Sequence, residues 1–82
     1  MIDAFTLADI EARIDAAQRR YGPFASTHEA LGVATEEWHE LIDAIRSNVV
    51  IDVQSECLDL AAVLIRLAMD LNDESTAQRS VK

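Results

Sequence analysis

Two pairs of acidic residues have the types and the spacing needed to bind a cation. Glu37 and Glu40 stand three positions apart, and Glu56 and Asp59 repeat that spacing further along the chain. Residues three apart share one face of a helix, so each pair would project to one side. If two such helices pack together, the four carboxylates meet, and at about 5 Å with an effective dielectric near 20 each like-charged pair costs roughly 3 kcal/mol. The cluster must then hold protons at neutral pH or hold a cation.

The ligand atoms of this cluster would all be carboxylate oxygens. Oxygen ligands select hard cations, Mg²⁺, Mn²⁺ or Ca²⁺, over Zn²⁺. Mg²⁺ seldom fills its coordination shell from protein alone, because it keeps water molecules and takes phosphate oxygens from a substrate. The pattern therefore predicts a Mg²⁺ site, which Mn²⁺ could also occupy, built to hold a ligand that bears phosphate.

A plainer interpretation is open for the first pair. Glu37 and Glu40 could belong to the solvated face of an ordinary surface helix. That interpretation does not fit Glu56 and Asp59, because the run over 57–71 is apolar almost all round. A helix that is apolar on most sides is buried on most sides, and a buried acid is costly unless a cation meets it.

Three helices are expected to position these acids, which makes the fold class all-α. The spacing of apolar residues predicts a first helix over about 7–20, capped by Thr6. A second helix is expected over 27–47, where Ser26 opens a capping box and Glu29 would reach back to the Ser26 N–H. Its apolar face should carry residues with helical spacing: Leu31, Ala34, Trp38, Leu41, Ile42 and Ile45.

The third helix is expected over 53–71, with Asp52 as its cap. Residues 48–51 include three β-branched side chains and are interpreted as a loop or a short bend. Such a short connection would make the second and third helices antiparallel neighbours. The tail over 72–82 is polar and is expected to be frayed or to form a short extra helical turn.

Composition limits the partners. The 82 residues make one domain, 1–82, and the net charge of −8 makes nucleic acid a poor partner and divalent cations good ones. Leu58–Leu71 is too short and too charged to span a membrane. The single cysteine, Cys57, cannot form an internal disulfide, which fits a reducing, cytoplasmic location. It is expected to be a packed core thiol.

The acidic pairs and their surroundings resemble a known family. Glu37-x-x-Glu40, a gap of 15 residues and then Glu56-x-x-Asp59 resemble the ExxE…ExxD signature of the MazG-like, all-α nucleoside triphosphate pyrophosphatases. The apolar pattern around the motif is similar to that of the small single-domain members, and the resemblance covers Leu7–Leu71. It implies hydrolysis of a nucleoside triphosphate, NTP or dNTP, to the monophosphate and pyrophosphate with Mg²⁺, and it implies that the four motif acids are the metal ligands.

Two further residues are candidates for the chemistry. Glu36 could orient the attacking water or serve a second metal, or it could be a surface acid. Arg66 could bind a substrate phosphate, or it could pair with Asp70 or with Asp59. The alternative function, from a different class, is a non-catalytic helical module that descends from the same family and binds a nucleotide or a protein.

Self-association is also expected. The third helix is apolar on more sides than two neighbouring helices can cover, and leaving that surface in water would expose a large patch. A homodimer or homotetramer would bury it and would complete a core like that of a four-helix bundle. Trp38 is expected to pack in the core rather than to stack on a base.

Overall fold

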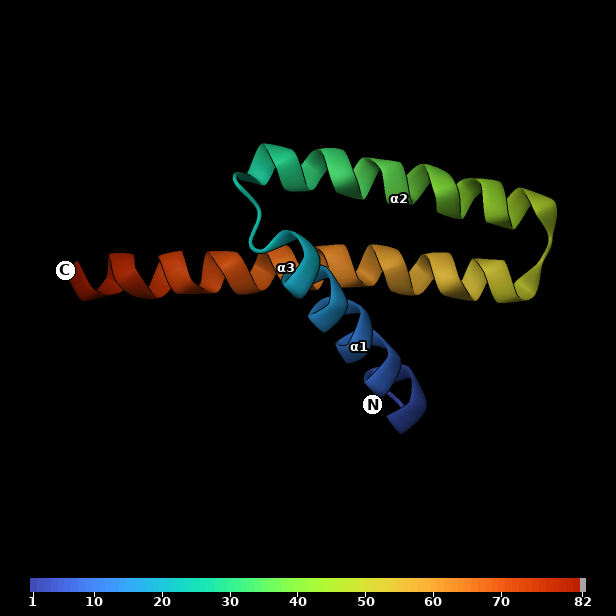
Figure 1. The fold of residues 1–82 in the computed structure, drawn as a ribbon, viewed down its shortest axis with the longest axis horizontal. Helices are drawn as coiled ribbons and strands as arrows, with labels where there is room; N and C mark the ends of the chain where they lie inside the picture. The colour runs from blue at the N-terminus through green and yellow to red at the C-terminus, as the bar shows by residue number, and fades with distance from the viewer. Residues whose placement is uncertain (82) are drawn as a thin grey trace.

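The chain folds into three α-helices, with no strand among the residues described (Figure 1). The computed structural model describes the backbone of residues 1–81 and the side chains of residues 1–72. Helix α1 spans Ala4–Tyr21, α2 spans Thr27–Ser47 and α3 spans Val50–Val81. The all-α prediction is confirmed. In this part of the chain no helix is long and apolar enough to cross a membrane.

Helices α2 and α3 form an antiparallel hairpin with a very short connection (Figure 1). Asn48 ends α2 in the left-handed conformation, with φ of 61°, and reverses the chain at once. The N–H groups of Asp52 and Val53 then donate to the Val49 carbonyl at 3.0 and 3.1 Å. Helix α3 therefore starts at Val50, three residues earlier than predicted, and Asp52 lies in its first turn instead of capping it.

The far end of α3 also differs from the prediction. The sequence predicts a helix end at residue 71, followed by a frayed tail or one short extra turn, but the backbone stays helical to Val81. Residues 72–81 include neither Gly nor Pro and several good helix formers, so no residue there breaks the backbone pattern. The polar composition of this segment predicted that α3 ends before it, and that prediction is wrong for the backbone. Lys82 lies outside the described residues.

Helix α1 begins earlier than its predicted cap. Asp3, not Thr6, is the N-cap: its carboxylate accepts the Thr6 N–H at 2.8 Å and the Thr6 hydroxyl at 2.8 Å. The helix ends at Gly22, where φ is 70° and the N–H donates to the Gln18 carbonyl at 2.9 Å. A positive φ favours glycine at this position, so the chain can turn towards α2.

The capping box before α2 forms almost as predicted. The Ser26 hydroxyl accepts the Glu29 N–H at 3.1 Å. The Glu29 carboxylate accepts the Ala25 N–H at 3.2 Å, one residue before the expected donor. The start of α2 is thereby fixed where the sequence placed it.

The core is small and is centred on α3. Helix α1 crosses α3 steeply and contacts it, but has no contact with α2 (Figure 1). Ile10 and Ile14 of α1 pack on Ala62, with Leu58 beside them. The buried apolar residues of the α2–α3 hairpin are mostly small: Ala30, Leu41, Ala44, Ala62 and Val63. Small side chains let two helices approach closely, which brings the polar groups along the seam together.

Helix α2 is rotated relative to its predicted apolar face. Leu31, Trp38 and Ile45 are 65%, 51% and 53% exposed, so the prediction of a core position for Trp38 is wrong in this chain. These residues recur every seven positions and form a second apolar stripe, outside the α2–α3 seam. Cys57 is likewise exposed, not packed in a core. The sequence pattern cannot tell which of two apolar stripes faces the same chain.

Candidate metal centre

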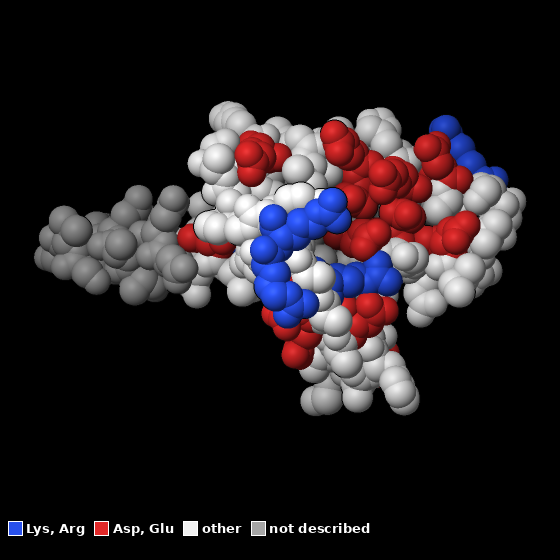
Figure 2. Space-filling model, in the orientation of Figure 1, with Lys and Arg blue, Asp and Glu red and all other residues white. Residues whose placement is uncertain are grey.

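The α2–α3 hairpin brings three of the four predicted ligands together. Glu37 comes from α2, and Glu56 and Asp59 come from consecutive turns of α3. Each offers a carboxylate oxygen, and these oxygens all lie within 4.8 Å of one another. Acidic side chains gather into a continuous patch over the hairpin (Figure 2). We call Glu37, Glu56 and Asp59 the acid cluster.

Two oxygens of the acid cluster are buried without a partner. Glu37 Oε2 and Glu56 Oε2 are shielded from solvent and find no hydrogen-bond donor among the described residues. A buried polar atom left unpaired costs about 1–3 kcal/mol, and more when it carries charge. The arrangement is unfavourable to the fold unless a proton or a cation offsets it.

The pKa values of the cluster reflect this crowding. The pKa of Glu37 is raised from 4.5 to about 7, first by burial and then by the charges of Glu40, Asp59 and Glu56 and by a hydrogen bond shared with Glu40. The pKa of Glu56 is also raised, first by burial and then by the charges of Glu40 and Asp59. Without metal, Glu37 therefore keeps its proton up to near neutrality, as expected of a carboxylate forced close to other carboxylates.

Glu40, the fourth predicted ligand, lies beside the acid cluster and not within it. Its side chain is exposed, and its oxygens are not among those within 4.8 Å of one another. It is nevertheless close enough to act on the pKa of both Glu37 and Glu56. Direct ligation by Glu40 stays a prediction, and the structure places it at the rim.

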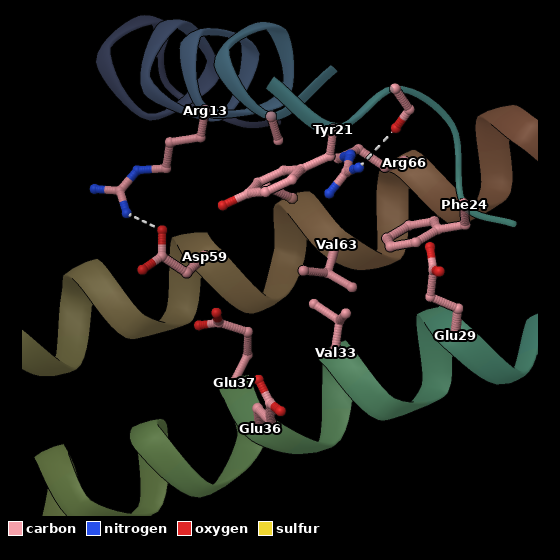
Figure 3. A pocket seen from close by; sticks show the side chains of 13 residues that line it. Arg13, Tyr21, Phe24, Glu29, Val33, Glu36, Glu37, Asp59, Val63 and Arg66 are labelled. Atoms are coloured by element: carbon pink, nitrogen blue, oxygen red, sulfur yellow. Dashed lines mark hydrogen bonds and ion pairs between the residues drawn. The ribbon is translucent and has the colours of Figure 1, made fainter. Parts of the chain in front are cut away.

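A pocket of about 770 Å³ opens next to the acid cluster. Glu37 and Asp59 line one end, and Phe24 and Arg66 lie towards the other (Figure 3). Glu36 also lines the pocket, with an exposed side chain next to Glu37. Acidic, basic and aromatic groups thus share one cavity of the size of a small-ligand site.

Arg66 forms neither of the ion pairs considered for it. Its Nη2 donates to the Gly22 carbonyl at 3.1 Å, and its guanidinium lies 4.4 Å from the centre of the Phe24 ring. Asp70 instead accepts the Phe24 N–H at 3.0 Å, and Asp59 has a different partner. Arg66 is only 5% exposed, and its Nε is buried without a partner among the described residues. It is therefore a fixed, buried cation in the pocket wall.

The partner of Asp59 is Arg13 of α1, which sequence reasoning missed. Arg13 Nη1 lies 2.6 Å from Asp59 Oδ1 across a separation of 46 residues. One signal could have found it: Arg13 stands three positions after Ile10 and next to Ile14, on the apolar side of the first helix. A cation on the inward face of a helix calls for an acid on the helix that it packs against.

Set against known proteins, the chain matches no protein-family model, no curated protein and no solved structure. The MazG-like assignment therefore depends on the acidic motif and its flanking pattern, and it is a proposal. The geometry of the acid cluster is an observation independent of that resemblance.

Proposed function

We propose that this chain is a MazG-like, Mg²⁺-dependent nucleoside triphosphate pyrophosphohydrolase, which converts an NTP or dNTP to the monophosphate and pyrophosphate. The observation that supports the proposal most directly is the acid cluster, in which carboxylate oxygens of three residues lie within 4.8 Å of one another. Two of the three, Glu37 and Asp59, line a pocket of about 770 Å³. The acid cluster is formed by residues of the two acidic motifs, which lie on successive helices.

The residues present fit a hard divalent cation. The donors are all carboxylate oxygens, and those of Glu37 and Glu56 include buried atoms that lack any partner among the described residues. Glu37, Glu56 and Asp59 would hold Mg²⁺ or Mn²⁺, with Glu40 at the rim as the fourth ligand. When bound, the metal supplies charge neutralisation for the phosphates and lowers the pKa of a water nucleophile.

The other polar residues of the pocket have complementary roles in this proposal. Arg66 follows Asp59 by seven positions, or about 10 Å along the axis of α3, and lies on nearly the same face. Arg66 could therefore contact a part of the nucleotide that does not reach the acid cluster. We propose that it binds a phosphate group. Glu36, beside Glu37 on the pocket wall, is the candidate for orienting the attacking water.

Self-association is part of the proposal. The exposed apolar stripe of α2 is matched by exposed apolar residues on α3: Leu64, Ile65, Met69 and Leu71. A second copy of the hairpin would bury both sets and would complete a four-helix bundle as a dimer, or within a tetramer. Light scattering should give at least twice the 9.1 kDa mass of the chain at micromolar concentration, and a monomer would contradict this part.

The test of the activity is pyrophosphate release from a panel of NTPs and dNTPs, coupled to an added inorganic pyrophosphatase. The proposal expects phosphate from at least one nucleotide with Mg²⁺, none with EDTA, and none from Glu37→Gln, which keeps the shape of the side chain. A folded protein that binds nucleotide but releases no pyrophosphate would support the rival instead. The exposed stripe through Trp38 favours that rival, a binding module without catalysis, because it also suits a protein partner.

A further inference from the structure

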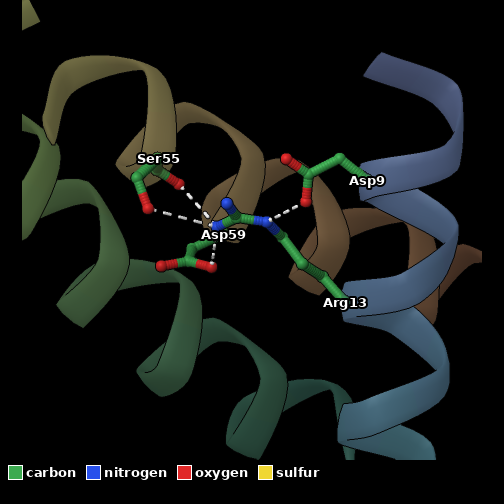
Figure 4. Close-up of polar contacts among 4 residues, drawn as sticks. All are labelled: Asp9, Arg13, Ser55 and Asp59. Atoms are coloured by element: carbon green, nitrogen blue, oxygen red, sulfur yellow. Dashed lines mark hydrogen bonds and ion pairs between the residues drawn. The ribbon is translucent and has the colours of Figure 1, made fainter. Parts of the chain in front are cut away.

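The side chain of Arg13, on helix α1, places a positive charge at the edge of the acid cluster. Arg13 Nη1 contacts Asp59 Oδ1 at 2.6 Å, the Ser55 carbonyl at 3.0 Å and the Ser55 hydroxyl at 3.3 Å. Its Nε contacts Asp9 Oδ1 at 2.7 Å. Figure 4 shows the guanidinium held between the two carboxylates. This geometry uses one oxygen of Asp59 and leaves its second oxygen on the side of Glu37 (Figure 3).

Arg13 is the cation that offsets charge in the acid cluster. Within the described part of the chain, the ion pairs are those of Arg13 with Asp9 and with Asp59. Arg66, the other arginine in the pocket wall, is directed to the Gly22 carbonyl and to Phe24 instead. The cluster is thus partly neutralised from α1, a helix that the acidic motif does not include.

A divalent ion held by Asp59 and Glu37 would lie next to this guanidinium. The separation would be well within the Debye length of about 8–10 Å, so the two cations would repel each other with little screening by salt. Two cations that share one carboxylate compete for it. The bond between Arg13 and Asp59 therefore opposes the binding of metal to the same side chain, while it supports the attachment of α1 to α3.

We propose that Arg13 is the built-in counter-ion of the acid cluster: it neutralises Asp59 when no metal is bound and lowers the affinity of the cluster for a divalent cation. The inference rests on the proposed metal site and adds a residue that regulates it. Arg13 stabilises the metal-free fold and sets how tightly the ion is held. A contact that only attached α1 to α3 would stabilise the metal-free fold but would not change the affinity for the ion.

The test is titration of Mn²⁺, followed by the electron paramagnetic resonance signal of the free ion, into wild type, Arg13→Gln and Arg13→Lys at constant ionic strength. Arg13→Gln should bind Mn²⁺ about tenfold more tightly, while its melting temperature in EDTA falls. Arg13→Lys keeps the charge and should stay near the wild-type affinity. Unchanged or weaker Mn²⁺ binding by folded Arg13→Gln would overturn the proposal, even if the melting temperature falls.

A second variant tests the same idea from the other side and does not need Arg13 to be removed. Asp9→Asn frees Arg13 from its competing carboxylate, so Arg13 should neutralise Asp59 more fully and weaken Mn²⁺ binding. Asp15→Asn is the matched control, because it removes the same charge from an exposed position on α1, while the ion pairs of Arg13 are with Asp9 and Asp59. Equal affinities in Asp9→Asn and Asp15→Asn would count against the counter-ion, and would decide the matter if Arg13→Gln fails to fold.

Glu37→Gln separates this inference from the proposed function. If wild type and Glu37→Gln bind Mn²⁺ equally, or if neither binds it, the proposed metal site is wrong and the proposed role of Arg13 is wrong with it. If wild type binds Mn²⁺ and Glu37→Gln does not, the metal site stands. In that case the Arg13 and Asp9 variants alone decide whether α1 regulates it.

Discussion

The two ends of the pocket differ in how their charged side chains are stabilised. At the acid end, Glu37 and Asp59 lie close to a further carboxylate, and buried oxygens there have no partner. At the other end, the charge of Arg66 is stacked on Phe24 and bonded to the Gly22 carbonyl. The arrangement around Arg66 stabilises the folded state, whereas the crowded carboxylates destabilise it. Substitutions at the two ends should therefore change the stability of the metal-free fold in opposite directions.

The largest effect is expected at the acid end, on activity. Glu37→Gln removes one of the proposed metal ligands. Because changes to residues that merely support a ligand already cost about 10–100-fold, the loss of activity should exceed about 100-fold. The metal-free variant should melt at the same temperature as wild type or higher, since one source of repulsion is gone. Coupled pyrophosphate release and melting in EDTA measure the two effects. A strongly destabilised variant would mean that Glu37 holds the fold together.

The opposite end should show a large effect on stability. Arg66→Ala removes a hydrogen bond to the Gly22 carbonyl, the stacking on Phe24 and the packing of a long side chain. Together these contribute about 2–3 kcal/mol, which lowers the melting temperature of a domain this small by about 10–20 °C. Arg66→Lys is the matched control that keeps the charge. If Arg66→Ala melts like wild type but raises the KM for nucleotide, the residue serves the ligand alone.

The contrast between the two ends was only partly visible in the sequence. The spacing of the pairs Glu37/Glu40 and Glu56/Asp59 predicted a cluster of four acids, because three-residue spacing fixes a helix face and a short connection fixes antiparallel packing. Three of the four come together in the structure. The pairing of Asp59 with Arg13 could not be predicted the same way. It depends on how α1 crosses α3, and no local pattern encodes the angle between helices distant in sequence.

The rotation of α2 shows a second limit. Trp38 and Leu41 both fit helical periodicity, yet one is 51% exposed and the other is 8% exposed. Periodicity identifies apolar stripes, but it cannot say whether a stripe faces the same chain or another one. The predicted starts of α1 and α3 were wrong for a different reason, because each depends on the local geometry of one residue: Asp3 caps α1, and Asn48 reverses the chain directly before α3.

A third experiment sharpens the comparison through pH. The pKa of Glu37 is about 7 in the folded protein and about 4.5 when unfolded, so between these values the unfolded state releases its proton first. The metal-free fold should lose stability as pH rises from 4.5 to 7 and then level off. The difference in melting temperature between wild type and Glu37→Gln, measured in EDTA across pH 4–8, isolates this effect. A difference that does not change with pH would contradict the raised pKa.

The smallest effect is expected at the rim, where the structure and the four-ligand prediction differ. Glu40 is exposed and outside the acid cluster, yet it raises the pKa of Glu37 and of Glu56. Glu40→Gln should therefore weaken Mn²⁺ binding by only a few fold, through the loss of a nearby charge in a region of high effective dielectric. It should also bring the pKa of Glu37 down, so that the pH dependence of stability shrinks. A loss of Mn²⁺ affinity as large as that of Glu37→Gln would instead show that Glu40 turns inward to bind the ion, as the family motif implies.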